Sequence, residues 1–292
     1  GILSFLYLLG IDKNLKKNLA QLLIVLILLV LFIFVGKNHD DFPYYHFPYT
    51  HILTQFEHPL GLGQLNNGFR NPSSLFFLNS LFYLPKIDIY LLHLSPVFFL
   101  AFANLIFYNL ILNKKIFKNN KSINLLSLLI ISFINIFFYR LAEHGTDRSG
   151  MIIFFIITLL ILVIRNNNYE QQKKNNLELF CFCSILLVLL ISLKQFYLIY
   201  APIILIVLLT EFRGKFTEIF LSRTTFYCIA FFFLIFFFNF INSGCLIYPA
   251  NFTCFHSLPW TPLSQSINDI NEFYELWSKA GATPQSHQGV ID

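Results

Sequence analysis

Two adjacent carboxylates, Asp40 and Asp41, are the residues of this sequence whose placement first suggests chemistry. They follow an apolar segment at 19–35, so they lie close to a membrane edge. Like charges beside a layer of low dielectric constant repel each other, which favours protonation of one or recruitment of a cation. A carboxylate in this position can act as general base toward a hydroxyl. It can also hold a divalent ion, Mg²⁺ or Mn²⁺, that neutralises a phosphate leaving group. The alternative is a helix cap that contacts lipid headgroups.

Five other residues are expected to bind a substrate beside these acids. His39 precedes the acidic pair, and Arg70 ends the glycine-bearing segment GLGQLNNGFR. Asp147 and Arg148 occupy the short turn GTDRSG, and Lys194 lies in the turn LKQF. The three cations are the candidates for binding a phosphate. The alternatives are an internal ion pair between Asp147 and Arg148, and snorkelling of Arg70 and Lys194 to lipid headgroups.

A metal site made of histidines is not predicted. His39, His46, His51 and His58 have spacings that match no zinc-ligand pattern. Their segment, PYYHFPYTHILTQF, mixes aromatic and polar residues and is typical of the membrane interface. We therefore expect interfacial histidines without a metal.

The five cysteines fall into two groups. Cys245 and Cys254 flank LIYPANFT near the end of the chain, where an oxidising compartment would allow a disulfide between them. Cys181, Cys183 and Cys228 lie within apolar segments and are expected to pack as small hydrophobic residues.

The composition indicates a membrane protein. Of 292 residues, 56% are apolar and only 12% are charged, about half the charged fraction of roughly 25% that is usual in soluble domains. Apolar segments at 19–35, 87–112, 123–139, 150–164, 177–193, 197–210 and 225–241 approach the length of about 20 residues that crosses a bilayer. We predict an all-α polytopic fold with about seven transmembrane helices, and an interfacial or re-entrant segment at 74–84. This composition excludes a disordered chain, a disulfide miniprotein and a nucleic-acid binder.

Charge predicts the orientation of these helices. Lys and Arg concentrate in the linkers at 12–18, 113–122, 165–176 and 211–223, which the positive-inside rule assigns to the cytoplasm. The other linkers mix His, Asp, Glu, Pro and Gly, so the working face is expected outside. We predict a transmembrane domain at 1–241, whose outer loop 36–73 contains interfacial helices, and the start of an outer C-terminal segment at 242–292. Further helices before residue 1 and a polar region after residue 292 are expected.

Several stretches resemble known membrane enzymes. The stretches HDDFPYYHFPYT, GLGQLNNGFRNPSSLFFLNSLF, GTDRSG and CLIYPANFTCF resemble a bacterial family of multi-pass proteins and, more widely, the GT-C superfamily of membrane glycosyltransferases. The resemblance implies a polyprenyl-phosphate-linked sugar donor and a glycan or lipid acceptor on the outer face of the bacterial cytoplasmic membrane. It also implies that Asp40 or Asp41 deprotonates the acceptor hydroxyl. Some of these enzymes use a divalent metal and others need none, and the adjacent acids differ from an Asp-x-Asp pattern.

Two other classes of function remain open. A transporter or flippase of lipid-linked or anionic solutes would need ionisable residues near the midplane of its helices. Only Asp88 and His93 come near this condition, and both lie toward the outer end of the predicted helix 87–112. A non-catalytic envelope-assembly protein in the lipid bilayer is the other possibility.

Overall fold

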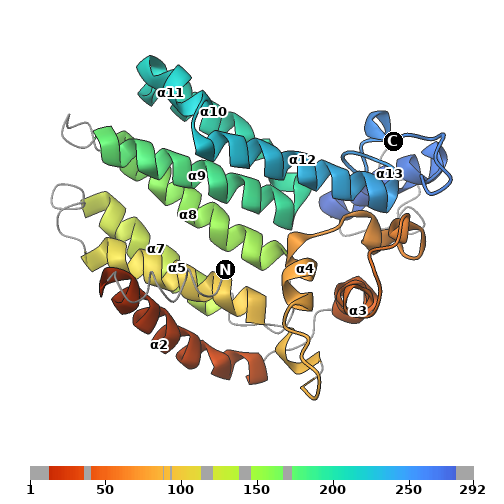
Figure 1. The fold of residues 1–292 in the computed structure, drawn as a ribbon, viewed down its shortest axis with the longest axis horizontal. Coiled ribbons are helices and arrows are strands. Elements are labelled where there is room, and N and C mark those ends of the chain that lie inside the picture. Colours follow the sequence, from red (N-terminus) through yellow and green to blue (C-terminus); the bar gives the residue numbers. More distant parts are fainter. Residues whose placement is uncertain are drawn as a thin grey trace. The chain divides into compact units, whose positions relative to one another are not determined.

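The structure, a computed structural model, describes residues 13–35, 41–87, 89–92, 94–112, 121–137, 146–166 and 173–280. These residues form helices and connecting turns without a β-strand, which confirms the predicted all-α class. The helices (Figure 1) are α2 (Lys13–Val35), α3 (Phe47–Gln55), α4 (Ser74–Ser80), α5 (Leu94–Leu112), α7 (Lys121–Phe137), α8 (Thr146–Asn166), α9 (Lys173–Leu193), α10 (Ala201–Glu211), α11 (Phe216–Phe220), α12 (Arg223–Ser243) and α13 (Ser264–Ala280).

Three described helices are long and apolar enough to cross a membrane: α8, the part Asn176–Leu193 of α9, and α12. A fourth is added if the bent pair Gln195–Glu211 and Arg213–Phe220 counts as one span. The helices that cover the other predicted spans have shorter apolar parts, Leu19–Leu29, Leu94–Tyr108 and Lys121–Ile136. Each predicted apolar segment therefore contains a helix, whereas the count of seven spans stays a prediction.

Two segments differ locally from the expectation. The segment 87–112 is not one helix, because α5 begins only at Leu94, after a separate 3₁₀ turn at Ile89–Leu91. Pro96 lies in the first turn of α5, where its fixed φ suits a helix start and its missing N–H costs no hydrogen bond. The basic linker predicted at 211–223 contains the short helix α11.

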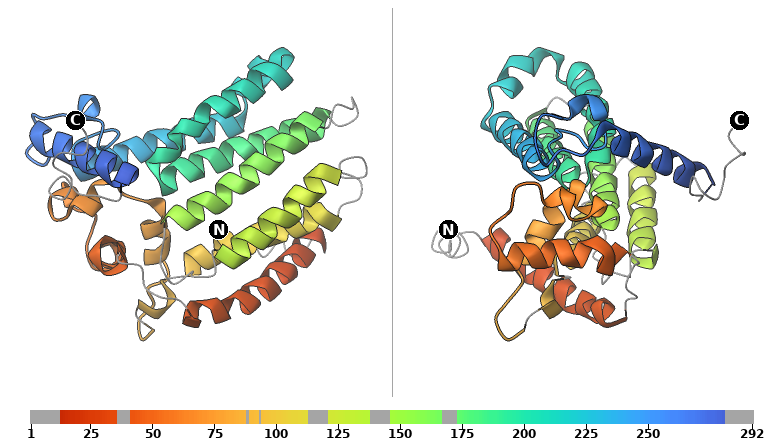
Figure 2. Two further views of the ribbon diagram at one scale, coloured as in Figure 1. Left: turned by 180° about the vertical axis from the view of Figure 1, so that it is seen from behind. Right: turned by 90° about the vertical axis from the view of Figure 1, so that its right-hand side faces the viewer.

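The described residues divide between two compact units. In the first unit, made of Gly1–Thr54 and Ser73–Cys228, helices α2, α5, α7, α8 and α9 lie side by side (Figure 2). Helix α8 contributes much of the core, since Ile152, Ile156, Leu159 and Val163 are buried at helical spacing. The amides of Asn104 on α5 and Asn135 on α7 bond to each other at 3.1 and 2.6 Å, so this bundle also carries a polar interhelical contact.

The second unit consists of Gln55–Pro72 and Ile229–Asp292. Residues 55–72 of this unit bond to the end of α12. The Gly61 N–H donates to the Ile241 carbonyl at 2.8 Å, and the Asn242 amide donates to the Phe69 carbonyl. Gly244 ends α12 with φ +72°, a left-handed conformation that favours glycine.

Candidate functional site

An ion pair joins the start of α8 to the turn after α9. The Lys194 ammonium donates to Asp147 Oδ1, and the two side chains remain 45% and 60% exposed. Asp147 lies in the first turn of α8, where the helix dipole favours a carboxylate. An exposed pair of this kind contributes about 1 kcal/mol or less to stability. It therefore leaves two charged groups accessible to a ligand at one end of two helices that are long and apolar enough to cross a membrane.

Polar groups without a partner lie beside this ion pair. Ser149 is buried and its hydroxyl has no hydrogen bond within the part of the chain that the structure describes. The same holds for the amide nitrogen and oxygen of Gln195, which directly follows Lys194. An unsatisfied buried polar group costs about 1–3 kcal/mol. These groups thus offer hydrogen-bonding capacity to water or to a bound hydroxyl or phosphate.

Gly150 allows helix α8 and the segment after α9 to approach each other closely. A Cβ at this position would lie 2.5 Å from Cε2 of Tyr197, so only glycine admits the ring against α8. Tyr197 belongs to the 3₁₀ segment Gln195–Tyr200, which also carries the unpaired amide. The close contact therefore keeps Gln195 beside the first turn of α8.

Helix α4 connects this site to the segment that follows the acidic pair. Its N-cap is Ser73, whose hydroxyl accepts from the Leu75 N–H at 3.2 Å and donates to the Leu193 carbonyl at 2.7 Å. Ser74 and Ser192 share a further hydrogen bond of 2.8 Å. The sequence Asn71-Pro72-Ser73 is typical of a helix entry. The anchor on the last turn of α9 is visible only in the structure.

The other side of α4 packs on α3 and on the π-helical segment Phe42–His46 before it. The rings of His46 and Tyr49 lie 5.4 and 5.1 Å from the ring of Phe76 on α4. Tyr49 is fully buried, and burial raises the pKa of its hydroxyl above the ordinary value of 10.0. Tyr49 thus remains neutral and serves as a packing residue of this contact.

Asp41 lies at the start of this helical segment. It precedes Phe42–His46, and the Tyr45 hydroxyl donates to its Oδ2 at 3.5 Å. Asp41 is half-buried and occupies the N-cap position of this segment. Asp40 and His39 lie outside the described residues, so the structure bears on one member of the acidic pair. Arg148 is half-buried in the first turn of α8, next to Asp147.

Arg70 belongs to the second unit and has a structural role there. Its Nε donates to the Gly63 carbonyl at 3.1 Å, and its Nη1 donates to the Tyr248 hydroxyl at 3.1 Å. The guanidinium also lies 5.6 Å from the centre of the Tyr248 ring. Arg70 thereby joins the GLGQLNNGFR segment to the loop between Cys245 and Cys254, whose sulfurs form a disulfide. Two of its five N–H groups are used, so its contact with a substrate stays a prediction.

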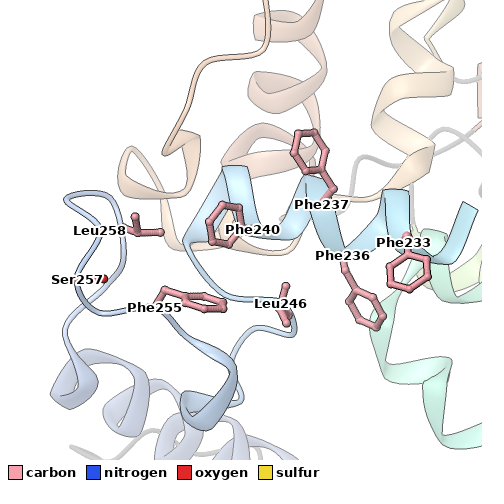
Figure 3. A pocket seen from close by; sticks show the side chains of 8 residues that line it. All are labelled: Phe233, Phe236, Phe237, Phe240, Leu246, Phe255, Ser257 and Leu258. Carbon is pink, nitrogen blue, oxygen red and sulfur yellow. The ribbon is translucent and has the colours of Figure 1, made fainter. Parts of the chain in front are cut away.

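The second unit also contains an apolar groove of about 420 Å³ (Figure 3). Four of its residues come from α12 and four from the loop that follows, and they are Phe233, Phe236, Phe237, Phe240, Leu246, Phe255, Ser257 and Leu258. Such a lining offers contacts to hydrocarbon and almost none to a sugar. Sequence reasoning missed this groove, although the Phe-rich end of α12 was a signal for it.

Sequence reasoning also missed Ser149, Gln195 and Tyr197. The available signal was that Ser149 follows Arg148 and Gln195 follows Lys194, whereas Tyr197 lies three positions after Lys194. Within the part of the chain that the structure describes, no group of three or more His, Cys, Asp or Glu side chains gathers.

Comparison with known proteins identifies a family. A family model described as "Domain of unknown function (DUF8201)" matches residues 2–289 of the chain. This range includes every described helix, from α2 to α13. No curated protein and no solved structure matches the chain.

Proposed function

We propose that this chain, which belongs to the DUF8201 family, is a GT-C-like membrane glycosyltransferase. In this proposal it transfers a sugar from a polyprenyl-phosphate-linked donor to a glycan or lipid acceptor on the outer face of the bacterial inner membrane. The observation that carries the proposal is the exposed Lys194–Asp147 pair, which lies where α8 begins and α9 ends. The hydrocarbon chain of a lipid-linked donor stays in the bilayer and its headgroup lies at the membrane surface. The donor phosphate would therefore lie level with this ion pair.

The cations of this site suit the phosphate of the donor. On binding, a phosphate oxygen replaces Asp147 as the partner of the Lys194 ammonium, and Arg148 supplies a second positive charge. Charge-assisted hydrogen bonds of this type are about twice as strong as neutral ones. The unpaired amide of Gln195 can donate to a further oxygen. These contacts stabilise the negative charge that develops on the leaving phosphate.

Asp41 is the proposed general base within the described part of the chain, and Asp40 is the alternative. The carboxylate takes the proton of the acceptor hydroxyl while the hydroxyl oxygen attacks the anomeric carbon of the donor sugar. The bond between that carbon and the phosphate oxygen breaks, and the phosphate keeps the electron pair. Helix α4 supports this assignment, since it contacts both the segment after Asp41 and the residues before Lys194.

The charge distribution along the helices favours an enzyme over a transporter. Between Arg148 and Arg165 the sequence of α8 contains no Asp, Glu, Lys, Arg or His, and α12 has none after Arg223. In the apolar part of α9, Asn176–Leu193, Glu178 lies near one end. A conduction path for an anionic solute needs such groups within the span. Asp88 and His93, the nearest approach to this condition in the sequence, lie outside the described residues.

The test is complementation of a strain that lacks the gene, with surface glycans and polyprenyl-linked sugars compared by mass spectrometry. We expect Asp41→Asn or Asp40→Asn to lower transfer by a factor of about 10²–10⁴, the usual effect of a general base. Lys194→Gln should lower it about tenfold or more, because one hydrogen bond to a charged group is lost. The matched control is Asp269→Asn, which changes an exposed carboxylate on α13.

Membrane levels of each variant are measured alongside transfer. The proposal is supported if the strain without the gene lacks one sugar in a glycan, and if only the parent gene and Asp269→Asn restore that sugar. Full restoration by both Asp40→Asn and Asp41→Asn at parental membrane levels would refute it.

A further inference from the structure

The chain turns sharply where α10 ends. The segments Gln195–Glu211 and Arg213–Phe220 meet at 92°. The first has enough residues to run roughly 30 Å as a 3₁₀ turn followed by an α-helix. When it crosses the bilayer, the segment after the bend lies parallel to the membrane surface. We call residues 212–223 the elbow.

The elbow belongs to the first unit, where packing and hydrogen bonds fix its conformation. Phe212 is buried, and its ring lies 5.0 Å from that of Phe180 on α9. Ile219 is also buried, and the Thr225 hydroxyl donates to its carbonyl at 2.6 Å. Ser222 accepts from the Thr225 N–H at 3.2 Å and so caps the start of α12. The elbow therefore holds its outward side chains in place.

Large apolar side chains project from the elbow. Phe216, Phe220 and Leu221 are 49%, 59% and 77% exposed. The two phenylalanine rings stack at 6.1 Å with an interplanar angle of 10°. An exposed apolar surface of this kind on an in-plane segment is typical of elements that lie at the boundary between headgroups and acyl chains.

Basic residues flank these apolar side chains. Lys215 pairs with Glu218 at 3.9 Å, and Glu211 pairs with Arg165 at 3.8 Å. Arg213 and Arg223 are exposed, and neither has an ion-pair partner among the residues that the structure describes. Two guanidinium groups are thus available to anions beside the exposed rings.

Helix α8 shows on which side of the membrane the elbow lies. The Arg165–Glu211 pair places the elbow level with the last turn of α8, and the Lys194–Asp147 pair lies at its first turn. A helix of 21 residues is about 30 Å long, which equals the thickness of the hydrocarbon layer. The elbow and the candidate site therefore face opposite surfaces.

From these observations we propose that the elbow binds the headgroup layer of anionic phospholipids. Arg213 and Arg223 contact lipid phosphates, and Phe216, Phe220 and Leu221 enter the adjacent acyl region. Anionic lipids concentrate in the cytoplasmic leaflet, and this is the side that the basic linkers predict for 211–223. The inference does not depend on the proposed transfer reaction.

The experiment uses the full chain in nanodiscs that contain equal amounts of phosphatidylglycerol and phosphatidylcholine. Native mass spectrometry counts the lipids of each type that stay bound to the protein. Parent chain is compared with Arg213→Gln/Arg223→Gln and with the charge-preserving Arg213→Lys/Arg223→Lys. Lys16→Gln/Lys17→Gln, which removes two exposed charges of α2, is the matched control.

We expect the Gln variant to lose the preference for phosphatidylglycerol at least tenfold, since each basic residue near a surface contributes about fivefold. The Lys variant and the α2 control should keep most of it. Unchanged preference in the Gln variant, or an equal loss in the α2 control, would overturn the proposal.

A second measurement needs no variant. The parent's preference for phosphatidylglycerol should fall when salt rises from about 50 mM to about 500 mM, because exposed charges are then screened. A preference that does not respond to salt would contradict binding through Arg213 and Arg223.

Discussion

Lys194 and Asp147 illustrate how much of the candidate site depends on single residues. Both were expected at the outer edge of the membrane, one as a phosphate ligand or lipid anchor and the other as a partner of Arg148. In the structure they pair with each other across two helices. The contact of Gly150 with Tyr197 keeps the unpaired amide of Gln195 nearby. The chemistry of the site thus follows from close packing at one glycine as well as from its charges.

His58 provides a residue-scale prediction about pH. It packs 5.8 Å from the ring of Phe238, and desolvation by burial lowers its pKa from the ordinary value of 6.5. Protonation of the His58 ring is therefore less favourable in the folded chain than in the unfolded chain. The stability contributed by the neutral ring is present in full above about pH 6.5, and it is lost as the pH falls through the lower folded-state pKa.

We expect the unfolding temperature of the second unit to fall between about pH 8 and about pH 5, and to fall less in His58→Phe. Thermal unfolding of the full chain in detergent, followed by near-ultraviolet circular dichroism, measures both. An identical pH dependence in parent and variant would show that His58 is not responsible.

At the scale of elements, α4 is the helix on which the site depends. It is only seven residues long, too short to be stable alone. Its contacts with Leu193 and Ser192 at one side, and with the rings of His46 and Tyr49 at the other, hold it in place. This helix therefore sets the position of the segment after Asp41 relative to Lys194.

Ser73→Ala tests this role of α4. The change removes both the N-cap and the bond to Leu193, and should lower the stability of the first unit by about 1–2 kcal/mol. It should also lower transfer in the complementation assay. Ser80→Ala is the matched control, because the Ser80 hydroxyl donates only to Phe77 within its own helix among the described contacts. Equal effects of the two changes on unfolding and transfer would argue against the anchor.

At the scale of the whole molecule, the chain combines a helical bundle with a second unit built from distant segments. Residues 55–72 and the end of α12 are joined by backbone and side-chain hydrogen bonds and by the Arg70–Tyr248 contact. Hydropathy alone assigned these segments to an outer loop and to the last span. Their association depends on buried partners such as Asn242, which a hydropathy profile does not detect.

The orientation of the molecule can be tested by cysteine labelling. We expect Ser264→Cys, at the start of α13, to react with a membrane-impermeant maleimide in intact cells. Gly214→Cys, in the elbow, should react only after the membrane is permeabilised.

A Cβ at Gly214 has no atom within 4 Å, so this substitution is tolerated. The native thiols Cys181, Cys183 and Cys228 lie in apolar helices, and the parent chain measures their background. Reaction of both sites from the same side would exclude the predicted topology.

The sequence by itself determined the features that depend on neighbouring residues. Composition predicted the all-α class and apolar runs located the helices, and the sequence Asn-Pro-Ser at 71–73, typical of a helix entry, directly precedes α4. These follow from local hydropathy and capping, which act over a few residues. The same rules failed at 211–223, where a basic linker with three exposed apolar residues formed a helix.

Only the tertiary structure decided which distant groups meet. Lys194 pairs with Asp147 across 47 positions, and Arg70 bonds to Tyr248 across 178. The exposed guanidinium groups of the elbow, the Gln195 amide that has no hydrogen bond among the described residues, and the anchor of α4 on α9 also became visible only there. Each depends on the packing of side chains from separate helices, and a pattern along one segment carries no information about that packing.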